Sequence, residues 1–297
     1  MKRSSVTFRV PASTSNLGSG FDTLGMALGI YNRVTVTRGI DPDTQTRDPF
    51  CQSVGEAFFQ KTGRPAEPFD VHVEGDVPRS RGLGSSVTVR SGIFAGLNAL
   101  WNTGLSPTDM AREVTRLEGH PDNAVASIFG GLTIAKTSGG ATHLENYLRF
   151  PLSPELCFTV VSPQLEVKTK ASRDLLPETL PFGEVVQSIN SFGFFLAAMV
   201  SGQIEKLAEV QTEEFIHQPY RLSGIPGARE ALDGARQAGA FGSWLSGSGS
   251  SLVAMSSRSN ASPVKEALLT PFTNGQIPFQ EFVLSADNDG MRPVIGV

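Results

Sequence analysis

The residues best suited to chemistry form a short loop rich in glycine and serine, RSRGLGSSVTVRSG at residues 79–92. Gly82 and Gly84 allow the backbone to bend sharply and to approach a ligand without a side chain in between. A helix is expected to begin near Ser85, so its free N–H groups and the positive end of its dipole would face that ligand. These features favour a bound phosphate, and the hydroxyl of Ser85 or Ser86 could serve as a ligand to Mg²⁺.

The spacing of this loop differs from that of two common nucleotide-binding loops. A Walker A loop places lysine and then serine or threonine after its second glycine, whereas Ser85 and Ser86 follow Gly84 directly. A dinucleotide-binding fingerprint needs a third glycine where this chain has Val87, and an acidic residue farther on. Backbone amides and a metal ion would therefore supply the charge that lysine provides elsewhere. An ordinary strand-to-helix turn is the alternative.

A second candidate group is the carboxylate of Glu118, at the end of a predicted helix over 105–118. Glu118 lies four residues after Val114 and eight after Met110, which places it on the apolar side of that helix. A carboxylate that points inward needs a partner, and a divalent cation is a suitable one. A glutamate at a frayed helix end is the alternative. In the following HPDN, Asp122 and Asn123 could cap a new helix or contact a ligand.

A third candidate is the segment SGSGSS at 246–251, which lies between two apolar runs in GAFGSWLSGSGSSLVAM (239–255). Its glycines would permit close contact with a ligand or with another loop. A simple hairpin loop is the alternative.

The elements that must position these residues mix strands and helices without regular alternation, which predicts an α+β fold. Alternating or apolar runs predict strands at 6–10, 33–37, 69–75, 130–136, 156–162 and 279–285, and on both sides of 246–251. Helices are predicted after the glycine loop and at 105–118, 182–201, 203–211, 226–238 and 262–270. Ser106, Pro107, Asp109 and Gly119 provide the start and stop signals of the 105–118 helix. Residues 11–28 begin with too much glycine and serine to predict regular structure.

Length and composition limit the function classes. The 297 residues suit one large or two medium domains, and we place a boundary near 150–155, giving domains 1–153 and 154–297. The net charge of −4 gives no bulk attraction for nucleic acid or for an anionic membrane. We see neither a secretory signal nor a stretch approaching a membrane span, and the two cysteines lie far apart, so we expect a reduced cytoplasmic protein. The four histidines lack metal-ligand spacing.

Six motifs, in order along residues 6–256, resemble the GHMP kinase superfamily and, within it, the homoserine kinase branch. The glycine loop and GAFGSWLSGSGSSLVA resemble motifs of the whole superfamily. Four others resemble those of the branch: VPASTSNLGSGFDTLGMAL, EGHPDNAVASIFGGL, KTKASRDLLP and HQPYRLSGIPG. The resemblance implies an N-terminal domain like the second domain of ribosomal protein S5 and a ferredoxin-like C-terminal domain, with ligands between them. It also implies transfer of the ATP γ-phosphoryl group to the hydroxyl of L-homoserine, on the route to threonine.

The resemblance also implies a role for individual residues. Arg81, Gly82, Leu83, Gly84, Ser85, Ser86 and Val87 would surround the phosphates, and Ser86 and Glu118 would hold Mg²⁺. Asn16, Asp22, His120, Asn123, Thr169, Arg173 and Arg221 would contact the amino acid, while Gly247, Ser248 and Gly249 would brace the loop or contact substrate. Arginine suits a carboxylate because it donates two parallel hydrogen bonds, and Asp22 or the Asn16 oxygen could accept from the ammonium. If the motifs were absent, a surface ion pair would be the better interpretation of each of these arginines.

Three departures from the family pattern affect these expectations. Val87, Thr88, Val89 and Arg90 stand where small alanines are usual, and Arg90 could oppose the helix dipole or reach a phosphate or an acidic neighbour. Ser19 replaces a usual proline, which should loosen the first motif. The segment between the metal-binding glutamate and HPDN is short compared with that of some family members, so the metal ligand depends on whether Glu118 or Glu113 is aligned with that glutamate. We favour Glu118 because it lies on the inner face of the predicted helix.

No lysine or histidine is an obvious base for the substrate hydroxyl, and in the branch a dedicated base is thought unnecessary. Asp22 is the best candidate if one exists. Two other functions stay open at this stage: a small-alcohol kinase of the mevalonate type, and a nucleotide-binding regulator without catalysis. The sequence does not determine the adenine-binding residues, feedback inhibition or the oligomeric state, for which a homodimer is one possibility.

Overall fold

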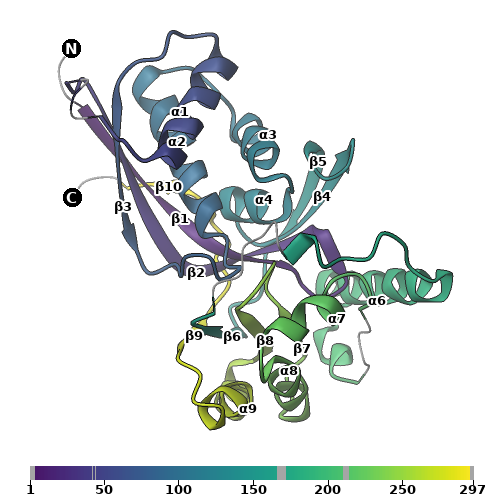
Figure 1. Cartoon of the computed structure of the whole chain (residues 1–297). Coiled ribbons are helices and arrows are strands. Elements are labelled where there is room, and N and C mark those ends of the chain that lie inside the picture. Colours follow the sequence, from purple (N-terminus) through teal and green to yellow (C-terminus); the bar gives the residue numbers. More distant parts are fainter. Residues whose placement is uncertain (1–3, 42, 44, 166–171, 210–213, 295–297) are drawn as a thin grey trace.

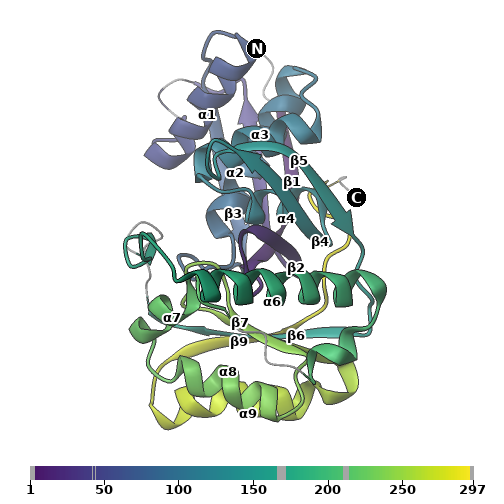
Figure 2. The same cartoon turned by 90° about the vertical axis from the view of Figure 1, so that its right-hand side faces the viewer.

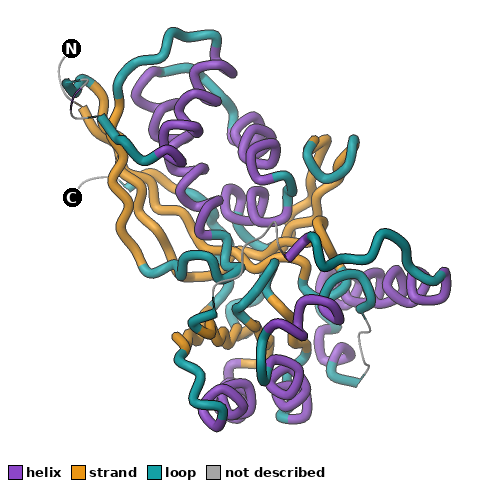
Figure 3. Tube along the Cα trace, in the orientation of Figure 1, coloured by secondary structure: helices purple, strands orange, loops and turns teal. Residues whose placement is uncertain are grey.

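The computed structural model describes residues 4–41, 43, 45–165, 172–209 and 214–294, and it places them in two antiparallel sheets with helices packed against each (Figures 1 and 3). This arrangement confirms the predicted α+β class. The first sheet has the order β10-β1-β2-β4-β5, with β3 paired to β2. Its strands are β1 (Ser4–Asn16), β2 (Gly20–Arg38), β3 (Phe69–Gly75), β4 (Leu132–Ser138), β5 (His143–Phe150) and β10 (Arg292–Pro293).

Four helices cover one face of the first sheet: α1 (Pro49–Thr62), α2 (Ser85–Trp101), α3 (Pro107–Glu118) and α4 (Asp122–Phe129) (Figure 1). Helix α2 lies close to β2 because two of its residues are glycines. A Cβ atom added at Gly92 would collide with the side chain of Val34, and one added at Gly96 would collide with Val36. The face of α2 that carries these two glycines therefore lies directly against β2.

The helix limits follow from local capping. Ser106 and Asp109 form a capping box at the start of α3, and Gly119 ends it with φ 86°, as predicted. Helix α1 was not predicted. Asp48 caps it by accepting from the amides of Phe50 and Cys51.

The structure corrects our expectation for residues 11–28, which form the regular strands β1 and β2 on either side of a turn at Leu17–Ser19. The hydroxyls that suggested a loop are buried and have tertiary partners. Ser13 donates to the side-chain oxygen of Asn123 at 2.8 Å, and Thr14 accepts from the indole of Trp244 at 2.9 Å. Such partners remove the cost of burying a hydroxyl, and they lie more than 100 residues away in the sequence.

The second sheet has the order β7-β8-β6-β9, with all neighbours antiparallel. Its strands are β6 (Leu156–Pro163), β7 (Gly242–Leu245), β8 (Leu252–Ser257) and β9 (Phe279–Leu284). Successive residues of β6 enter different cores. Val161 packs with α8 (Ala228–Gln237) and α9 (Ala261–Asn274), while Phe158 and Val160 pack toward the first sheet and α6 (Phe182–Ser201). Helices α8 and α9 lie on one side of the second sheet and α6 lies on the other (Figure 2), so its central strands β6 and β8 are buried.

The remaining short elements are α7 (Gln218–Arg221) and the 3₁₀ turns η2 (Ile204–Leu207), η3 (Leu222–Gly224) and η4 (Arg258–Asn260). The predicted helix over 182–201 is confirmed, but the one over 203–211 is wrong because the described part of that range contains only η2. Gly202, in the left-handed conformation, ends α6, and of the four η2 residues only Leu207 is buried.

The expected domain boundary falls between β5 and β6, while β10 returns from the end of the chain to pair with β1, Phe8 opposite Pro293. The division at 153/154 stays a prediction. One expectation about membranes needs correction: by length and composition alone, α6 is apolar enough to cross a membrane, and 28% of its most apolar stretch is buried.

Candidate active site

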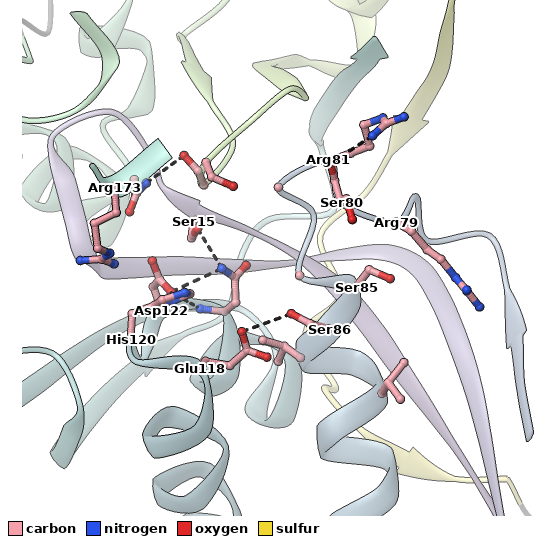
Figure 4. A pocket seen from close by; sticks show the side chains of 18 of the residues that line it. Ser15, Arg79, Ser80, Arg81, Ser85, Ser86, Glu118, His120, Asp122 and Arg173 are labelled. Atoms are coloured by element: carbon pink, nitrogen blue, oxygen red, sulfur yellow. Dashed lines mark hydrogen bonds and ion pairs between the residues drawn. The ribbon is translucent and has the colours of Figure 1, made fainter. Parts of the chain in front are cut away.

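One cavity of about 520 Å³ brings together motifs that are distant in the sequence. The ends of β1 and β2, the glycine loop, the α3–α4 connection, the loop at 246–249 and two arginines of the second half contribute to its wall. Figure 4 shows Ser85, Ser86, Glu118, His120, Asp122 and Arg173 around this space. The cavity therefore contains the candidate residues of both halves of the chain.

The glycine loop presents the start of α2 to the cavity. Gly82 and Gly84 have φ 76° and 67°, in the left-handed region that glycine adopts without strain. Helix α2 begins at Ser85, and no described side chain caps its first amides. Because uncapped N–H groups and the helix dipole favour an anion, this wall is suited to phosphate.

The loop at 246–251 holds the glycine loop in place. The Ser246 hydroxyl donates to the Gly82 carbonyl at 2.7 Å, and the Ser251 amide donates to the Arg81 carbonyl at 3.0 Å. Leu83 is buried in the core, and its carbonyl accepts from the Ser13 amide at 3.2 Å. The glycine loop is thus fixed from both halves of the chain.

Ser86 and Glu118 meet at the base of the glycine loop, with the hydroxyl donating to Glu118 Oε2 at 3.2 Å (Figure 4). Arg90 pairs with the other oxygen, Oε1, and its guanidinium lies 4.7 Å from the centre of the Phe50 ring. Arg90 therefore reaches an acidic neighbour, which selects one of the possibilities that the sequence left open. Glu113 instead pairs with Lys61 at 2.9 Å and is not part of the cavity wall.

His120 and Asp122 form a buried pair beside this carboxylate, with 2.7 Å between His120 Nδ1 and Asp122 Oδ1. Burial alone would lower the pKa of His120, but the charge and hydrogen bond of Asp122 outweigh it and raise that pKa to about 9. The imidazole is therefore a cation at neutral pH. Asp122 also accepts from the Asn123 amide at 2.7 Å, so it fixes the start of α4.

Asn123 connects α4 to β1. Its side-chain nitrogen donates to the Ser15 hydroxyl at 3.0 Å, and its oxygen accepts from Ser13. Only 6% of Asn123 is exposed, and it still forms part of the cavity wall. The amide is therefore held in a single orientation toward the cavity.

Opposite charges from the two halves meet at the far end of the cavity. Arg173 donates to both carboxylate oxygens of Asp22 at 2.9 Å each. Asn16 accepts from the Asp22 amide at 3.1 Å and donates to the Gly247 carbonyl at 3.3 Å. Phe21 lies beneath the guanidinium of Arg173, 5.4 Å from the ring centre.

Arg221 is 5% exposed and lies 5.2 Å from the centre of the same Phe21 ring. Its described hydrogen bonds go to the carbonyl oxygens of Gly247, at 3.1 Å, and Ser172, at 3.3 Å, and not to a carboxylate. Burial, together with the positive charge of Arg173, lowers the pKa of Arg221 to about 10. A buried cation neutralised only in part attracts an anion.

Asp22, His120 and Asp122 bring potential metal-ligand atoms within 4.8 Å of one another. Both oxygens of Asp22 accept from Arg173, and the ring nitrogen of His120 nearest Asp122 is engaged with it. In the described structure both oxygens of Asp22, His120 Nδ1 and Asp122 Oδ1 therefore belong to a network of opposite charges and hydrogen bonds.

Most of the predicted site residues form the wall of this cavity: Asn16, Asp22, Arg81, Gly82, Gly84, Ser85, Ser86, Val87, Glu118, His120, Asn123, Arg173, Arg221, Gly247 and Ser248. Leu83 and Gly249 are absent from the wall. A Cβ added at Gly249 would touch Ile225 and Leu245, which indicates a bracing position. Thr169 lies outside the described residues.

Sequence reasoning missed the apolar end of the cavity, formed by Phe50, Cys51, Val73 and Val89, and the neighbouring Asp48, Arg79 and Ser80. It also did not select Ser15 and Phe21, and it left Asp122 open as a helix cap or a ligand contact. The sequence DPFC at 48–51 carries an N-cap signal followed by proline, which could have revealed α1 and thereby Phe50.

Comparison with known proteins identifies two family models in this chain. The GHMP kinases N terminal domain matches residues 50–131, and the GHMP kinases C terminal domain matches residues 183–274. A homoserine kinase of Moorella thermoacetica is 35% identical over 257 residues, covering 83% of this chain and 86% of that protein. A homoserine kinase of Synechococcus is 33% identical and covers 97% of both chains.

Solved structures show the same fold. The crystal structure of homoserine kinase from Cytophaga hutchinsonii has a TM-score of 0.86 at 22% identity, covering 98% of this chain and 97% of that one. A putative homoserine kinase from Listeria monocytogenes has a TM-score of 0.76 at 25% identity, with 98% and 100% covered. A mevalonate diphosphate decarboxylase from Enterococcus faecalis has a TM-score of 0.70 at 17% identity, with 99% of both covered.

Proposed function

Because the chain belongs to the homoserine kinase family of GHMP kinases, we propose that its cavity transfers the γ-phosphoryl group of ATP to the hydroxyl of L-homoserine. The product would be O-phospho-L-homoserine, an intermediate on the route to threonine. The two-domain GHMP kinase fold, predicted as an S5-like domain followed by a ferredoxin-like domain, is confirmed.

One observation carries the proposal: a phosphate-binding helix start and a set of charges that match an amino acid lie in the same cavity. The first part is the uncapped start of α2 after Gly82 and Gly84. The second part is Asp22 with the two arginines 173 and 221. A substrate with an ammonium, a carboxylate and a hydroxyl could bind the charged end and direct its hydroxyl toward the glycine loop.

ATP would place its phosphates against the amides of Ser85 and Ser86 and its base toward the apolar end. Phe50, Val73 and Val89 line that end. An aromatic ring and two branched aliphatic side chains suit a flat heteroaromatic base.

The residues at the base of the glycine loop fit a bound Mg²⁺. Ser86 Oγ and Glu118 Oε2 are two oxygen ligands 3.2 Å apart on the cavity wall, and Arg90 occupies only the other carboxylate oxygen. Mg²⁺ in kinases is held by one or two such protein oxygens together with phosphate oxygens and water. When bound there, it would neutralise part of the phosphate charge.

Homoserine would place its carboxylate at Arg221, whose described partners are neutral carbonyls. Its ammonium would approach Asp22, Asn16 and the cavity face of β1. Since Arg173 already binds Asp22 through two hydrogen bonds, substrate must share or replace that pair. Asp22 therefore orients the amino acid, and the Asp22 carboxylate is already paired with Arg173 before substrate binds.

These groups account for phosphoryl transfer without a strong base. A loose transition state requires alignment and charge stabilisation more than proton removal, and the hydroxyl proton can leave late, to the phosphate. The His120 cation, held by Asp122, adds positive charge beside Glu118. Asp22 is the candidate base only if Arg173 releases it.

A substrate panel tests this proposal. Purified protein with ATP and Mg²⁺ should release ADP with L-homoserine far faster than with L-threonine, mevalonate or sugars. The Glu113→Ala variant should behave like the natural chain, because that carboxylate lies outside the cavity. Turnover of mevalonate but not homoserine would replace the proposal by another small-alcohol kinase. Nucleotide binding without turnover of any compound would support the regulator.

A further inference from the structure

A charged residue of α2 pairs with the candidate metal ligand from outside the cavity. Arg90 lies one turn after Ser86, about 6 Å farther along the helix axis and away from the end that faces the cavity. It pairs with Glu118 Oε1, and only 17% of the Arg90 side chain and 9% of the Glu118 side chain are exposed. Among the described residues, the cavity wall includes Ser86 and Glu118 but not Arg90. The pair therefore occupies one oxygen of a wall carboxylate without placing the arginine in the cavity.

Two groups hold the guanidinium of Arg90. Its Nη1 donates to Glu118, and the centre of the Phe50 ring lies 4.7 Å from its central carbon, within the range of a cation–π contact. Its Nε is buried and has no hydrogen-bond partner in the described structure. Breaking a buried ion pair leaves an uncompensated charge, which is strongly destabilising. We therefore expect Arg90 to keep Glu118 Oε1 when a ligand binds.

The two oxygens of Glu118 consequently have different partners. Ser86 donates to Oε2 at 3.2 Å (Figure 4), and Arg90 binds Oε1. Because Ser86 and Arg90 are four residues apart on one helix, they lie on the same face of it and hold the carboxylate at both of its oxygens. The plane of the carboxylate is thus fixed, and Glu118 offers a cation in the cavity one oxygen rather than two.

The number of carboxylate oxygens on offer distinguishes two common divalent cations. Mg²⁺ demands a near-ideal octahedron with oxygens at about 2.0–2.1 Å, whereas Ca²⁺ takes about six to eight oxygens at about 2.3–2.6 Å and can bind both oxygens of one carboxylate. We propose that Arg90 is a positioning residue that confines Glu118 to a single oxygen facing the metal, and that it thereby makes the site select Mg²⁺ over Ca²⁺. This inference rests on the proposed function, because it takes Ser86 and Glu118 as the ligands of the cation bound with ATP.

A direct contact of Arg90 with the nucleotide phosphates fits the structure less well. The phosphates would lie at the first amides of α2, whereas Arg90 lies one turn farther on with its guanidinium against Phe50. A move toward phosphate would also remove the cationic partner of a carboxylate whose side chain is 9% exposed. The contacts of Arg90 therefore favour a role that acts through Glu118.

Isothermal titration calorimetry with a non-hydrolysable ATP analogue measures this selectivity without turnover. The Kd of the analogue is determined once in excess Mg²⁺ and once in excess Ca²⁺, and the ratio of the two values is compared between variants. Both ions carry the same charge, so the loss of the arginine charge changes the two affinities alike and cancels in the ratio. The natural chain should bind the Mg²⁺ complex at least about 10-fold more tightly, and Arg90→Met should reduce that preference to about threefold or less.

Two further variants serve as controls. Arg116→Met removes an arginine that pairs with Glu113 at 3.0 Å on the same helix as Glu118 but outside the cavity wall, so it should keep the natural ratio. Arg90→Lys keeps a cation that can donate to Oε1, so it should retain most of the preference although it lacks the planar group that stacks on Phe50. Thermal melts followed by circular dichroism establish that each variant is folded at the temperature of the titration.

Three results would overturn this role of Arg90: equal affinity of the natural chain for the two complexes, an unchanged ratio in Arg90→Met, or the same loss of preference in Arg116→Met. The first of these needs no variant, so the test does not depend on the folding of Arg90→Met. Weaker binding of both complexes by Arg90→Met at an unchanged ratio would assign Arg90 to the phosphates instead. None of these results contradicts phosphoryl transfer to homoserine, which the substrate panel tests separately. A natural chain that binds neither complex would refute both proposals.

Discussion

Replacing Gly82 with alanine should separate the glycine loop from the loop at 246–249. The added methyl group would lie 3.0 Å from the Gly249 nitrogen and 3.1 Å from its oxygen, and closer still to the Ser246 carbonyl oxygen. These are backbone atoms, so no change of side-chain rotamer relieves the contact. The loop must instead move by about 1 Å, and a displacement of that size costs on the order of 10²-fold in rate.

The backbone cost of Gly82→Ala can be measured separately with Gly104→Ala. Gly104 has φ 72°, close to the 76° of Gly82, but an added Cβ at Gly104 would meet nothing within 4 Å. Gly104→Ala should lose about 1 kcal/mol of stability because alanine is strained in the left-handed region, which is about 2–4 °C in Tm, and Gly82→Ala should lose at least as much. Only Gly82→Ala should also lose phosphoryl transfer.

Steady-state kinetics with varied ATP and saturating homoserine provides the assay. We expect kcat/KM for ATP to fall on the order of 10²-fold in Gly82→Ala, equivalent to about 2.7 kcal/mol, and to be unchanged in Gly104→Ala. Equal kinetics in the two variants would show that contact between the loops does not position the phosphates, and the account of the glycine loop would then be wrong.

Three further outcomes follow from the site. Glu118→Ala should lower kcat at least about 10²-fold because Mg·ATP is no longer held in place, while the control Glu113→Ala should keep kcat. Stopped-time assays of ADP release measure both, and equal losses in the two variants would contradict the assignment of Glu118 as the metal ligand. Arg221→Lys should raise KM for homoserine by about 10- to 100-fold with little change in KM for ATP, because lysine lacks the paired donors of arginine; a change confined to ATP would refute the role. His217 is fully buried, and burial with the charge of Arg221 lowers its pKa to about 3. Below about pH 6.5 this histidine binds a proton in the unfolded chain but not in the folded chain. Its contribution to the free energy of unfolding is therefore fully present above that pH and falls by about 2 kcal/mol between pH 6.5 and 5. Urea titrations at each pH should show this fall in the natural chain and not in His217→Gln. If the free energies of unfolding of the two proteins changed with pH in parallel, His217 would not be the cause.

The sequence determined the features whose causes lie within a few residues of one another. Gly82 and Gly84 specify left-handed backbone, and Ser106 with Asp109 specifies a helix start, wherever they occur. The motifs, read in order, identified the family and the chemistry because six local patterns rarely coincide.

The tertiary structure decided which side chains are partners. Ser86 and Glu118 are 32 residues apart, and Asp22 and Arg173 are 151 apart. Nothing local indicates that Arg90 would take one oxygen of Glu118, or that Arg173 would occupy the carboxylate expected to bind substrate.

Folding also decided what becomes of the hydroxyls of β1. Ser13, Thr14 and Ser15 suggest a loop when read alone, because a buried hydroxyl without a partner is costly. Asn123 and Trp244 supply those partners from distant parts of the chain, so the segment becomes a buried strand. Local sequence fixes backbone preference, whereas the free energy of a buried polar group depends on neighbours that only the completed fold brings together.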